Sequence, residues 1–447
     1  GGKVVEIGNV DEVYASPAMP YTIGLLRSIP RIDGAESSRL TSIDGAPPSP
    51  VALPPGCAFA PRCPAAAPQC DANVPALLSI SPTRMTACVR QSEIASLQSS
   101  GKLYVDGPRH VAQASSTDAV ALEVRNLKKT FPLMKGSVLR RRAGSVYAVD
   151  GVDLTLRQGR SLALVGESGC GKTTTLLEIL NMVAPEAGVI TVLGRNVAEL
   201  SKKQRLEIRK DLQIVFQDPF ASLDPRLPIG DAIAEPLDTF GMPRAEQNQR
   251  VMELLELVGL QRDHASRYPS EFSGGQRQRI AIARALALNP KVIALDEPVS
   301  ALDVSVRAGV LNLLAELQEK LSLSYLFVSH DLAVVQHVAD DIAVMYLGGI
   351  VESGPVDEVF ARPQHPYTQA LLSAVPIPDP KVERVRKRII LQGDLPSPAN
   401  PPTGCRFHTR CHVRSTLSPE LAAKCVSDRP ELASRKSSRV ACHAPLN

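Results

Sequence analysis

A glycine-rich segment at residues 161–180 holds the residues most able to do chemistry in this sequence. It reads SLALVGESGCGKTTTLLEIL, in which an apolar strand leads to Gly166, four variable residues and then Gly171-Lys172-Thr173. Glycines let backbone N–H groups approach phosphate oxygens, and the start of the following helix favours an anion. The lysine can reach the β- and γ-phosphates of a nucleotide, and the threonine hydroxyl can bind Mg²⁺. The predicted phosphate site comprises Gly166, Glu167, Ser168, Gly169, Cys170, Gly171, Lys172, Thr173 and Thr174.

Two adjacent acids, Asp296 and Glu297, form a second candidate group. They follow the apolar residues Val292–Leu295, which predict a buried strand, so both acids are expected at a strand end. An acid beside a phosphate loop can hold Mg²⁺ through water, and a second acid can polarise an attacking water. We therefore expect Asp296 to serve Mg²⁺ and Glu297 to be the general base.

The sequence SGGQ predicts a second anion site. It opens a helix whose apolar positions include Ile280 and Leu286, and backbone N–H groups at a helix start attract phosphate. Because the phosphate loop already supplies one such site, we expect the second one to serve a nucleotide held by another domain. Its members are Ser273, Gly274, Gly275 and Gln276.

Together, these motifs resemble the nucleotide-binding domain of ATP-binding cassette (ABC) proteins over residues 122–375. The resemblance implies an α/β P-loop NTPase fold with a helical subdomain that holds the SGGQ signature, and ATP and Mg²⁺ as cofactors. It also implies a head-to-tail dimer in which each ATP lies between one phosphate loop and the opposing signature.

The same resemblance implies roles for residues outside these motifs. Phe131 matches the aromatic that stacks on adenine, and Gln217 matches the glutamine that contacts Mg²⁺ and the γ-phosphate. His330 matches the switch histidine at the γ-phosphate, and Ser300–Asp303 match the loop that crosses the dimer interface. The implied catalytic residues are Glu297, His330 and Gln217, and the implied Mg²⁺ ligands are Thr173, Gln217 and Asp296.

A segment at residues 348–372 has a near copy at residues 1–26, including Val-Asp-Glu-Val and Pro-Tyr-Thr. Each copy leads to Gly-Cys-x-Phe-x-x-Arg-Cys, at Gly56–Cys63 and at Gly404–Cys411, and then to two further cysteines. The sets are Cys57, Cys63, Cys70 and Cys88, and Cys405, Cys411, Cys425 and Cys442, with only Cys170 outside them. The chain is therefore expected to hold two small four-cysteine modules.

The four thiols common to both copies favour a metal site. Histidines accompany only the second copy, so the shared ligands are thiolates, which suit Zn²⁺ or an iron–sulfur cluster. Structural zinc sites usually pair cysteines two to four residues apart, a spacing that neither copy has. The spacing and the family tail favour a [4Fe–4S] cluster in each module, with zinc and unliganded reduced thiols as the alternatives.

Three sequences resemble those of the ATPase subunits of oligopeptide and dipeptide importers, a group that also includes importers of nickel and other solutes. They are HPYTQALL and the Gly-Cys-x-Phe-x-x-Arg-Cys segment in the tail, and FQDPFASLDPR at residues 216–226. The resemblance implies an ATP-hydrolysing motor for peptide uptake, peripheral to the cytoplasmic face of the membrane. The implied partners are two integral-membrane permease subunits, a first cassette and an extracytoplasmic substrate-binding protein. The alternatives are an importer ATPase for another solute and a cassette ATPase that acts without transport.

The elements that must position these residues follow from the patterning of the chain. From residue 121 to residue 375, short apolar runs alternate with helical patterns, which predicts an α/β domain. Residues 1–95 are expected to be the tail and four-cysteine module of a preceding cassette, residues 96–120 a linker, and residues 376–447 the second module. Because no phosphate loop precedes residue 122, the sequence resembles the C-terminal part of a two-cassette ATPase.

Bulk composition limits the function classes. A net charge of +4 over 447 residues gives no basis for nucleic-acid binding. No apolar run reaches the ~20 residues that span a bilayer. Any membrane role is therefore expected to be peripheral or through a partner.

Overall fold

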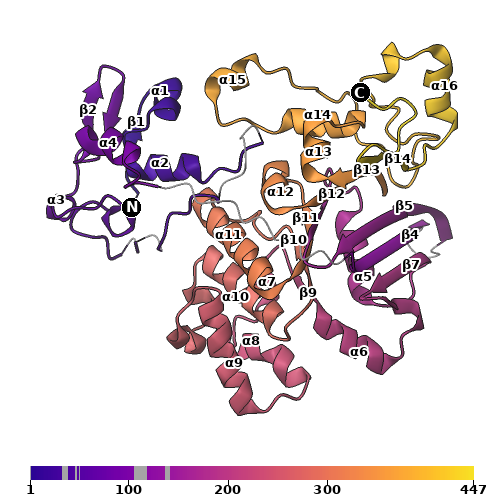
Figure 1. The fold of residues 1–447 in the computed structure, drawn as a ribbon, viewed down its shortest axis with the longest axis horizontal. Helices are drawn as coiled ribbons and strands as arrows, with labels where there is room; N and C mark the ends of the chain where they lie inside the picture. Colours follow the sequence, from indigo (N-terminus) through magenta and orange to yellow (C-terminus); the bar gives the residue numbers. More distant parts are fainter. Residues whose placement is uncertain are drawn as a thin grey trace.

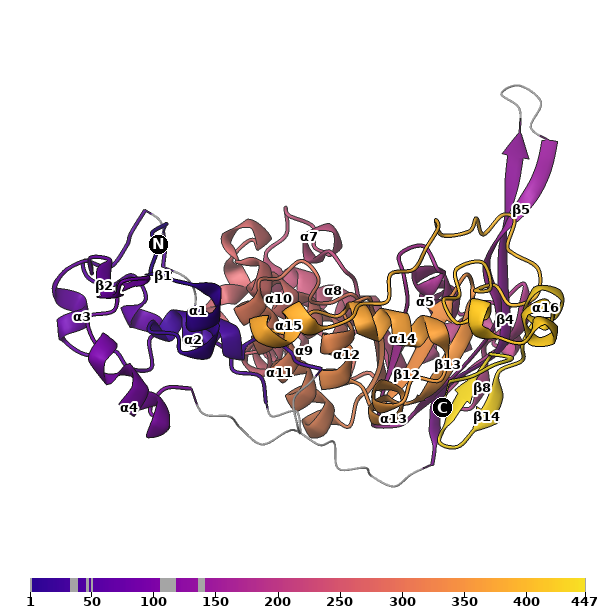
Figure 2. The ribbon, with the colours of Figure 1, turned by 90° about the horizontal axis from the view of Figure 1, so that it is seen from above.

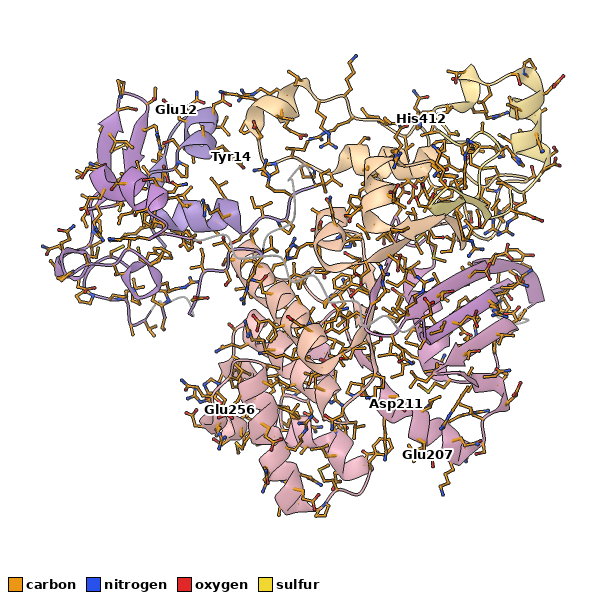
Figure 3. The ribbon with its side chains drawn as sticks, in the orientation of Figure 1. Glu12, Tyr14, Glu207, Asp211, Glu256 and His412 are labelled. Atoms are coloured by element: carbon orange, nitrogen blue, oxygen red, sulfur yellow. The ribbon has the colours of Figure 1, made fainter. Side chains whose placement is uncertain are left out.

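The computed structural model describes residues 2–32, 39–45, 48–49, 51–104, 118–135 and 141–446. The N-terminal module lies at one end of the molecule and the four-cysteine part of the C-terminal module at the other (Figures 1 and 2). Residues 380–385 of the C-terminal module reach back to the N-terminal module, where Arg384 pairs with Asp11 at 2.8 Å. Side chains fill the space between the helices and the sheets (Figure 3).

The α/β domain is built on an eight-stranded sheet of order β14-β15-β13-β12-β6-β11-β10-β9. Five consecutive strands, β12, β6, β11, β10 and β9, are parallel, which places their carboxyl ends on the same side of the sheet. Strands β6, β10 and β11 are buried along their whole length, as expected when helices cover both faces of a parallel sheet. The strands are β6 (Ser161–Val165), β9 (Leu212–Val215), β10 (Val292–Asp296), β11 (Ser324–Ser329), β12 (Asp341–Tyr346), β13 (Gly349–Pro355), β14 (Ala433–Arg435) and β15 (Ser438–Val440).

Helices pack on this sheet and form two apolar cores. The larger core joins the sheet to a helical subdomain of α8, α9 and α10, which lies to one side of the sheet (Figure 1). The helices of the domain are α5 (Lys172–Asn181), α6 (Lys202–Asp211), α7 (Pro219–Ser222), α8 (Ile229–Thr239), α9 (Arg244–Leu257), α10 (Gly274–Leu286), α11 (Val304–Leu321), α12 (Leu332–Val338), α13 (Val356–Ala361), α14 (Pro366–Ala374), α15 (Pro380–Val385) and α16 (Pro419–Ser427).

A second, antiparallel sheet of order β5-β4-β7-β8 lies beside α5. Its long strands β4 and β5 extend away from the body of the molecule (Figure 2). The apolar faces of this sheet pack with α5 in the smaller core. The strands are β4 (Val120–Lys135), β5 (Arg141–Arg157), β7 (Ala187–Val192) and β8 (Arg195–Asn196).

The two modules share one fold, so the sequence repeat is also a structural repeat. In the N-terminal module β3 lies between β1 and β2, and in the C-terminal module β15 lies between β13 and β14. The registers match, because Glu6 pairs with Thr86 and Glu352 pairs with Val440, each two residues before the last cysteine of its set. The N-terminal elements are β1 (Glu6–Ile7), α1 (Val10–Ala15), α2 (Pro20–Arg27), α3 (Gln69–Ala72), β2 (Leu78–Ser81), β3 (Arg84–Thr86) and α4 (Ile94–Ser99).

The end of the N-terminal module overlaps the predicted linker. Helix α4 covers residues 94–99, and Ile94 and Leu103 are buried with Ile23 in the core of the N-terminal module. Part of the predicted linker at residues 96–120 therefore belongs to that module, because its apolar residues complete a small core. Residues 105–117 of the predicted linker lie outside the described residues.

The C-terminal module is less separate from the α/β domain than the division at residue 376 implies. Strand β15 extends the main sheet by pairing with β13, and Phe407 is buried in the larger core. The module therefore packs on the α/β domain through both the main sheet and the larger apolar core.

Candidate nucleotide site

The phosphate loop connects β6 to α5 and needs glycine at two positions. Gly166 has φ +155° and Gly171 has φ +110°. A Cβ atom on Gly166 would lie 2.2 Å from the carbonyl oxygen of Met345, and one on Gly171 would lie 2.2 Å from that of Ala148. The loop is therefore pressed against two neighbouring strands, and only glycine fits at these points.

Within the loop, Lys172 is folded back onto the backbone. Its ammonium donates to the carbonyl oxygens of Gly166 at 2.8 Å and of Glu167 at 3.0 Å, and the residue is only 6% exposed. Thr173, which would ligate Mg²⁺, is exposed at the start of α5. Ser168 and Gly169 are also exposed, so the outer surface of the loop is open to a ligand. Cys170 is buried, and burial raises the pKa of its thiol.

Three candidate catalytic side chains meet at the carboxyl ends of β9, β10 and β11. The Gln217 amide donates to one carboxylate oxygen of Glu297 at 3.1 Å, and the other oxygen lies 2.9 Å from His330 Nδ1. Glu297 has a left-handed backbone with φ +46°, and its N–H donates to the Val328 carbonyl oxygen at 2.9 Å. That hydrogen bond ties the residue to the neighbouring strand, which fixes the direction of its side chain.

Asp296 is the last residue of β10 and is 8% exposed. Burial and the neighbouring Glu297 carboxylate raise the pKa of Asp296, whereas the Lys172 ammonium lowers it. Two carboxylates at one strand end repel each other, and a divalent cation would relieve this repulsion. Oxygen donors from Thr173, Gln217 and Asp296 therefore fit the preference of Mg²⁺ for oxygen ligands.

Phe131 lies on β4 with 46% of its surface exposed, so one ring face is open to a base. The Lys129 ammonium lies 5.7 Å from its ring centroid and also pairs with Glu178 of α5 at 2.9 Å. This pair fixes β4 to the helix that begins at the phosphate loop, which sets where the aromatic ring lies.

The signature residues lie apart from this cluster. Ser273 caps α10, because its hydroxyl accepts from the Gln276 N–H at 3.3 Å and the Gln276 side chain accepts from the Ser273 N–H at 3.0 Å. Figures 1 and 2 place α10 and α5 in different parts of the molecule. The Ser300 hydroxyl donates to the Glu297 carbonyl oxygen at 3.0 Å, and Asp303 caps α11. One chain thus brings together the phosphate loop, the acids, the glutamine and the histidine, but not the signature.

Two residues at the phosphate loop were missed at the level of sequence. The Glu167 N–H donates to the Tyr367 hydroxyl at 3.0 Å, and the Glu167 carboxylate accepts from Arg410 at 2.9 Å. Both partners belong to motifs present in both repeats, where Tyr21 and Arg62 are the counterparts. The repeated Pro-Tyr-Thr and Gly-Cys-x-Phe-x-x-Arg-Cys sequences were the available signal.

The eight module cysteines converge on two small cavities. A cavity of about 20 Å³ is lined by all four cysteines of the C-terminal set, and another of about 20 Å³ by all four of the N-terminal set. Burial raises the pKa of Cys405 to about 11 and that of Cys442 to about 12. Within the described ranges, no group of three or more histidine, cysteine, aspartate or glutamate side chains is arranged to hold a single metal ion.

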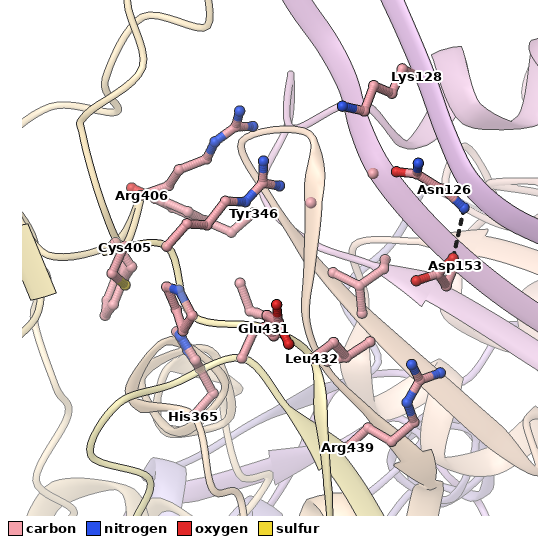
Figure 4. Close-up of a pocket in the computed structure, with 18 residues that line it drawn as sticks. Asn126, Lys128, Asp153, Tyr346, His365, Cys405, Arg406, Glu431, Leu432 and Arg439 are labelled. Carbon is pink, nitrogen blue, oxygen red and sulfur yellow. Dashed lines mark hydrogen bonds between the residues drawn. The ribbon is translucent and has the colours of Figure 1, made fainter. Parts of the chain in front are cut away.

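A larger cavity of about 490 Å³ lies between the antiparallel sheet and the C-terminal module (Figure 4). Lys128, Arg406 and Arg429 line it, and all three pair with Asp150 of β5. The Asp150 carboxylate is therefore the point at which the module is fixed to the sheet.

Two families of known proteins match segments of this chain. Residues 149–300 match the family described as ABC transporter, and residues 5–70 and 351–416 each match the oligopeptide/dipeptide transporter C-terminal region. A structural comparison finds cbiO1 of Clostridium perfringens, at 27% identity and a TM-score of 0.48, over 55% of this chain and 92% of that one.

Proteins of similar sequence identify the family of this chain more specifically. The oligopeptide transport ATP-binding protein AppF of Bacillus subtilis is 51% identical over 325 residues, which cover 72% of this chain and 96% of the relative. OppF of Escherichia coli is 48% identical, with 72% and 96% covered. OppD of Mycobacterium tuberculosis is 55% identical over 379 residues, which make up 85% of this chain. The chain spans only 62% of the length of that relative. The chain belongs to the family of ABC-type oligopeptide transport ATP-binding proteins.

Proposed function

We propose that the chain is an ATP-hydrolysing motor subunit of an ABC importer for oligopeptides or dipeptides. The observation that carries the proposal is the Gln217–Glu297–His330 cluster at the strand ends of the phosphate-loop domain. Similar proteins are oligopeptide and di/tripeptide transport ATP-binding proteins, which supports peptide as the solute class.

Each residue of the site has its own role in the proposed hydrolysis of ATP. The loop N–H groups and Lys172 bind the phosphates, and Phe131 stacks on adenine. Glu297 takes a proton from the attacking water, while Gln217 and His330 hold its carboxylate in place and reach the γ-phosphate. Mg²⁺, when bound by Thr173, Gln217 and Asp296, neutralises charge on the phosphates.

A second cassette completes each site. Ser273 and its neighbours at the start of α10 would meet the ATP held by the partner cassette, since they lie away from this chain's own loop. We assign the N-terminal module, a structural copy of the C-terminal one, to that partner cassette. Two ATP molecules then close the pair, and hydrolysis reopens it.

The permease is proposed to dock beside the glutamine. Phe216 and Phe220 are 45% and 54% exposed there, and the Arg277 guanidinium lies 3.4 Å from the Phe220 ring centroid. An exposed aromatic pair is suited to receive a helix from a membrane partner. In the described part of the chain, no helix combines the length and apolar character needed to span a bilayer. The proposed attachment is through two permease subunits at the cytoplasmic face.

We further propose a [4Fe–4S] cluster in each module. All four thiols of each set line one cavity, as the ligands of a single bound group would, and four cysteine thiolates are the ligand set of a [4Fe–4S] cluster. In both modules the N–H of the first cysteine donates to the carbonyl oxygen of the third, at 2.7 Å for Cys57 and 2.9 Å for Cys405. The ligand positions are therefore held alike in the two copies.

The transport assignment is tested by affinity purification of the tagged chain from membranes. Two permease subunits should co-purify, and cells without the gene should lose growth on defined peptides as the sole source of a required amino acid. Loss of nickel uptake with peptide growth intact would instead favour another solute. Co-purification of ribosomal or DNA-repair proteins without permeases would favour a cassette ATPase outside transport.

A further inference from the structure

The phosphate loop is held by the C-terminal module as well as by its own strand and helix. Glu167, the second residue of the loop, has all three of its polar groups engaged. Its N–H donates to Tyr367 at 3.0 Å, its carboxylate accepts from Arg410 at 2.9 and 3.3 Å, and its carbonyl accepts from Lys172 at 3.0 Å. Two of these three contacts come from residues outside the loop.

The two outside partners are themselves rigid. Tyr367 is fully buried on α14 and packs on Phe407, with ring centroids 5.4 Å apart. The N–H of Arg410 donates to the Phe407 carbonyl oxygen at 3.0 Å, so Arg410 projects from a turn that the core fixes. The Arg410 side chain is 11% exposed and the Glu167 side chain is 27% exposed, so the ion pair is more protected from solvent screening than a surface pair.

The N-terminal module provides an internal comparison. Its Tyr21 packs on Phe59 at 5.2 Å, as Tyr367 packs on Phe407. Its Arg62 donates to the backbone carbonyls of Ile43 and Asp44, each at 3.1 Å. The same module position can therefore be filled by arginine without any contact to the phosphate loop of this chain.

We infer that Arg410 and Tyr367 are positioning residues for ATP binding, through which the C-terminal module sets the orientation of the phosphate loop. This inference rests on the proposed ATPase function and deepens it. The Glu167 peptide holds Lys172, and Lys172 must turn to the phosphates when ATP binds. Without the contacts to Glu167, the loop would lose more conformational entropy when ATP binds, and its affinity for ATP would be lower. The affinity for ATP therefore depends on the C-terminal module, which lies far from the loop in the sequence.

Isothermal titration of the purified chain with Mg²⁺ and ATP tests this inference. Arg410→Gln and Glu167→Gln should each weaken ATP binding by about three- to thirtyfold, the range of coupling through such contacts. The variant with both substitutions should bind ATP as tightly as the single variant with the lower affinity, because both substitutions break the same ion pair. Arg410→Lys should restore part of the affinity, and Arg62→Gln is the matched control that should bind as the unsubstituted chain.

Several results would overturn the inference. Unchanged affinity in both single variants would do so, as would fully additive effects or an equal loss in Arg62→Gln. If Arg410→Gln fails to fold, Glu167→Gln still decides the question, since it alters only a loop carboxylate. In the assembled ATPase, Arg410→Gln should raise KM for ATP and leave kcat near its original value, which a general loss of stability would not do.

The result for Lys172→Ala separates this inference from the proposed function. If Lys172→Ala abolishes binding while Arg410→Gln has no effect, the nucleotide site holds and only the positioning role fails. If Lys172→Ala binds ATP as tightly as the unsubstituted chain, the nucleotide site itself is assigned wrongly.

Discussion

At the scale of single residues, the chemistry depends on how Glu297 is held. Its two carboxylate oxygens face different partners, Gln217 at 3.1 Å and His330 at 2.9 Å. Both partners therefore orient the carboxylate, and orientation is a large part of general-base catalysis.

Replacing Glu297 by Gln should therefore preserve ATP binding and slow hydrolysis. The amide keeps the shape and the contacts but cannot accept a proton, so we expect hydrolysis at least ~10²-fold slower. The measurement is steady-state release of phosphate by the assembled ATPase, together with equilibrium ATP binding. Glu256→Gln, which changes an exposed acid on α9, serves as the control. Turnover near the original rate in Glu297→Gln would remove the residue from this role.

Sequence motifs predicted the residues of this cluster, because their types and spacing follow from phosphate chemistry. They did not predict Tyr367 and Arg410 as contacts of Glu167. Tyr367 and Arg410 follow Glu167 in the chain by 200 and 243 residues. Only the packing of α14 and the module turn on the domain brings them to the loop.

At the scale of elements, Asp150 fixes the C-terminal module to the antiparallel sheet. Arg429 donates to its carboxylate at 2.7 Å and to its carbonyl oxygen at 2.7 Å, and Arg406 and Lys128 also pair with it. Burial would raise the pKa of Asp150, but the charges of Arg429, Arg406 and Lys128 outweigh burial and lower it. The carboxylate is therefore stabilised in its charged form.

Asp150→Asn should loosen the module without unfolding the domain. Loss of one partner of a half-buried ion pair leaves Arg406 poorly paired, at a cost of about 1–3 kcal/mol. Hydrogen exchange of residues 404–442 should rise, whereas the exposed pair of Asp224 and Arg226 should matter little, so Asp224→Asn is the control. Folding lowers the pKa of Asp150, so its carboxylate stabilises the folded state above about pH 4. This stabilisation is lost as the pH falls through the pKa of Asp150 in the folded state. Equal exchange in Asp150→Asn and the original chain would contradict this.

The cysteine sets give a second prediction at this scale. Protein purified without oxygen should be brown and hold about four iron atoms per set, or about eight per chain. Cys405→Ser should lose the iron of one set and weaken the C-terminal module, because cluster binding contributes to folding. Cys170→Ser, which changes the one cysteine outside the sets, should keep the iron of both. A metal analysis that finds one zinc ion per set and no iron would contradict the cluster and assign a zinc site to each set.

The linker shows why elements were harder to predict than motifs. Helix α4 is six residues long and rich in serine, so no helical period is visible over residues 94–99. Strands β14 and β15 are three residues long, too short for alternation to reveal that they extend the main sheet. In both cases tertiary burial, rather than local pattern, decides the structure.

At the scale of the whole molecule, the proposed function gives one chain two half-sites that would face different nucleotides. The phosphate loop at α5 and the signature at α10 lie in different parts of the fold (Figure 1). In this proposal a complete ATP site needs a second cassette.

Ser273→Ala tests this division. Loss of the signature hydroxyl should lower hydrolysis by the assembled pair, because the partner's ATP loses a contact, while ATP binding to this chain alone should stay unchanged. The substitution also removes a helix cap, a loss of about 1 kcal/mol. Ser201→Ala is the matched control, since Ser201 and Gln204 form the same capping box on α6. A fall in ATP affinity of the isolated chain with Ser273→Ala would contradict the composite site.

The central claim is that ATP hydrolysis at Glu297 drives peptide uptake. The most direct measurement is uptake of a labelled oligopeptide into proteoliposomes that hold the full assembly, with ATP and Mg²⁺ supplied on the cassette side. We predict uptake that requires ATP and falls at least ~10²-fold in Glu297→Gln, in proportion to the loss of hydrolysis. Peptide uptake that continues at the original rate in Glu297→Gln, or hydrolysis without any peptide uptake, would contradict the account.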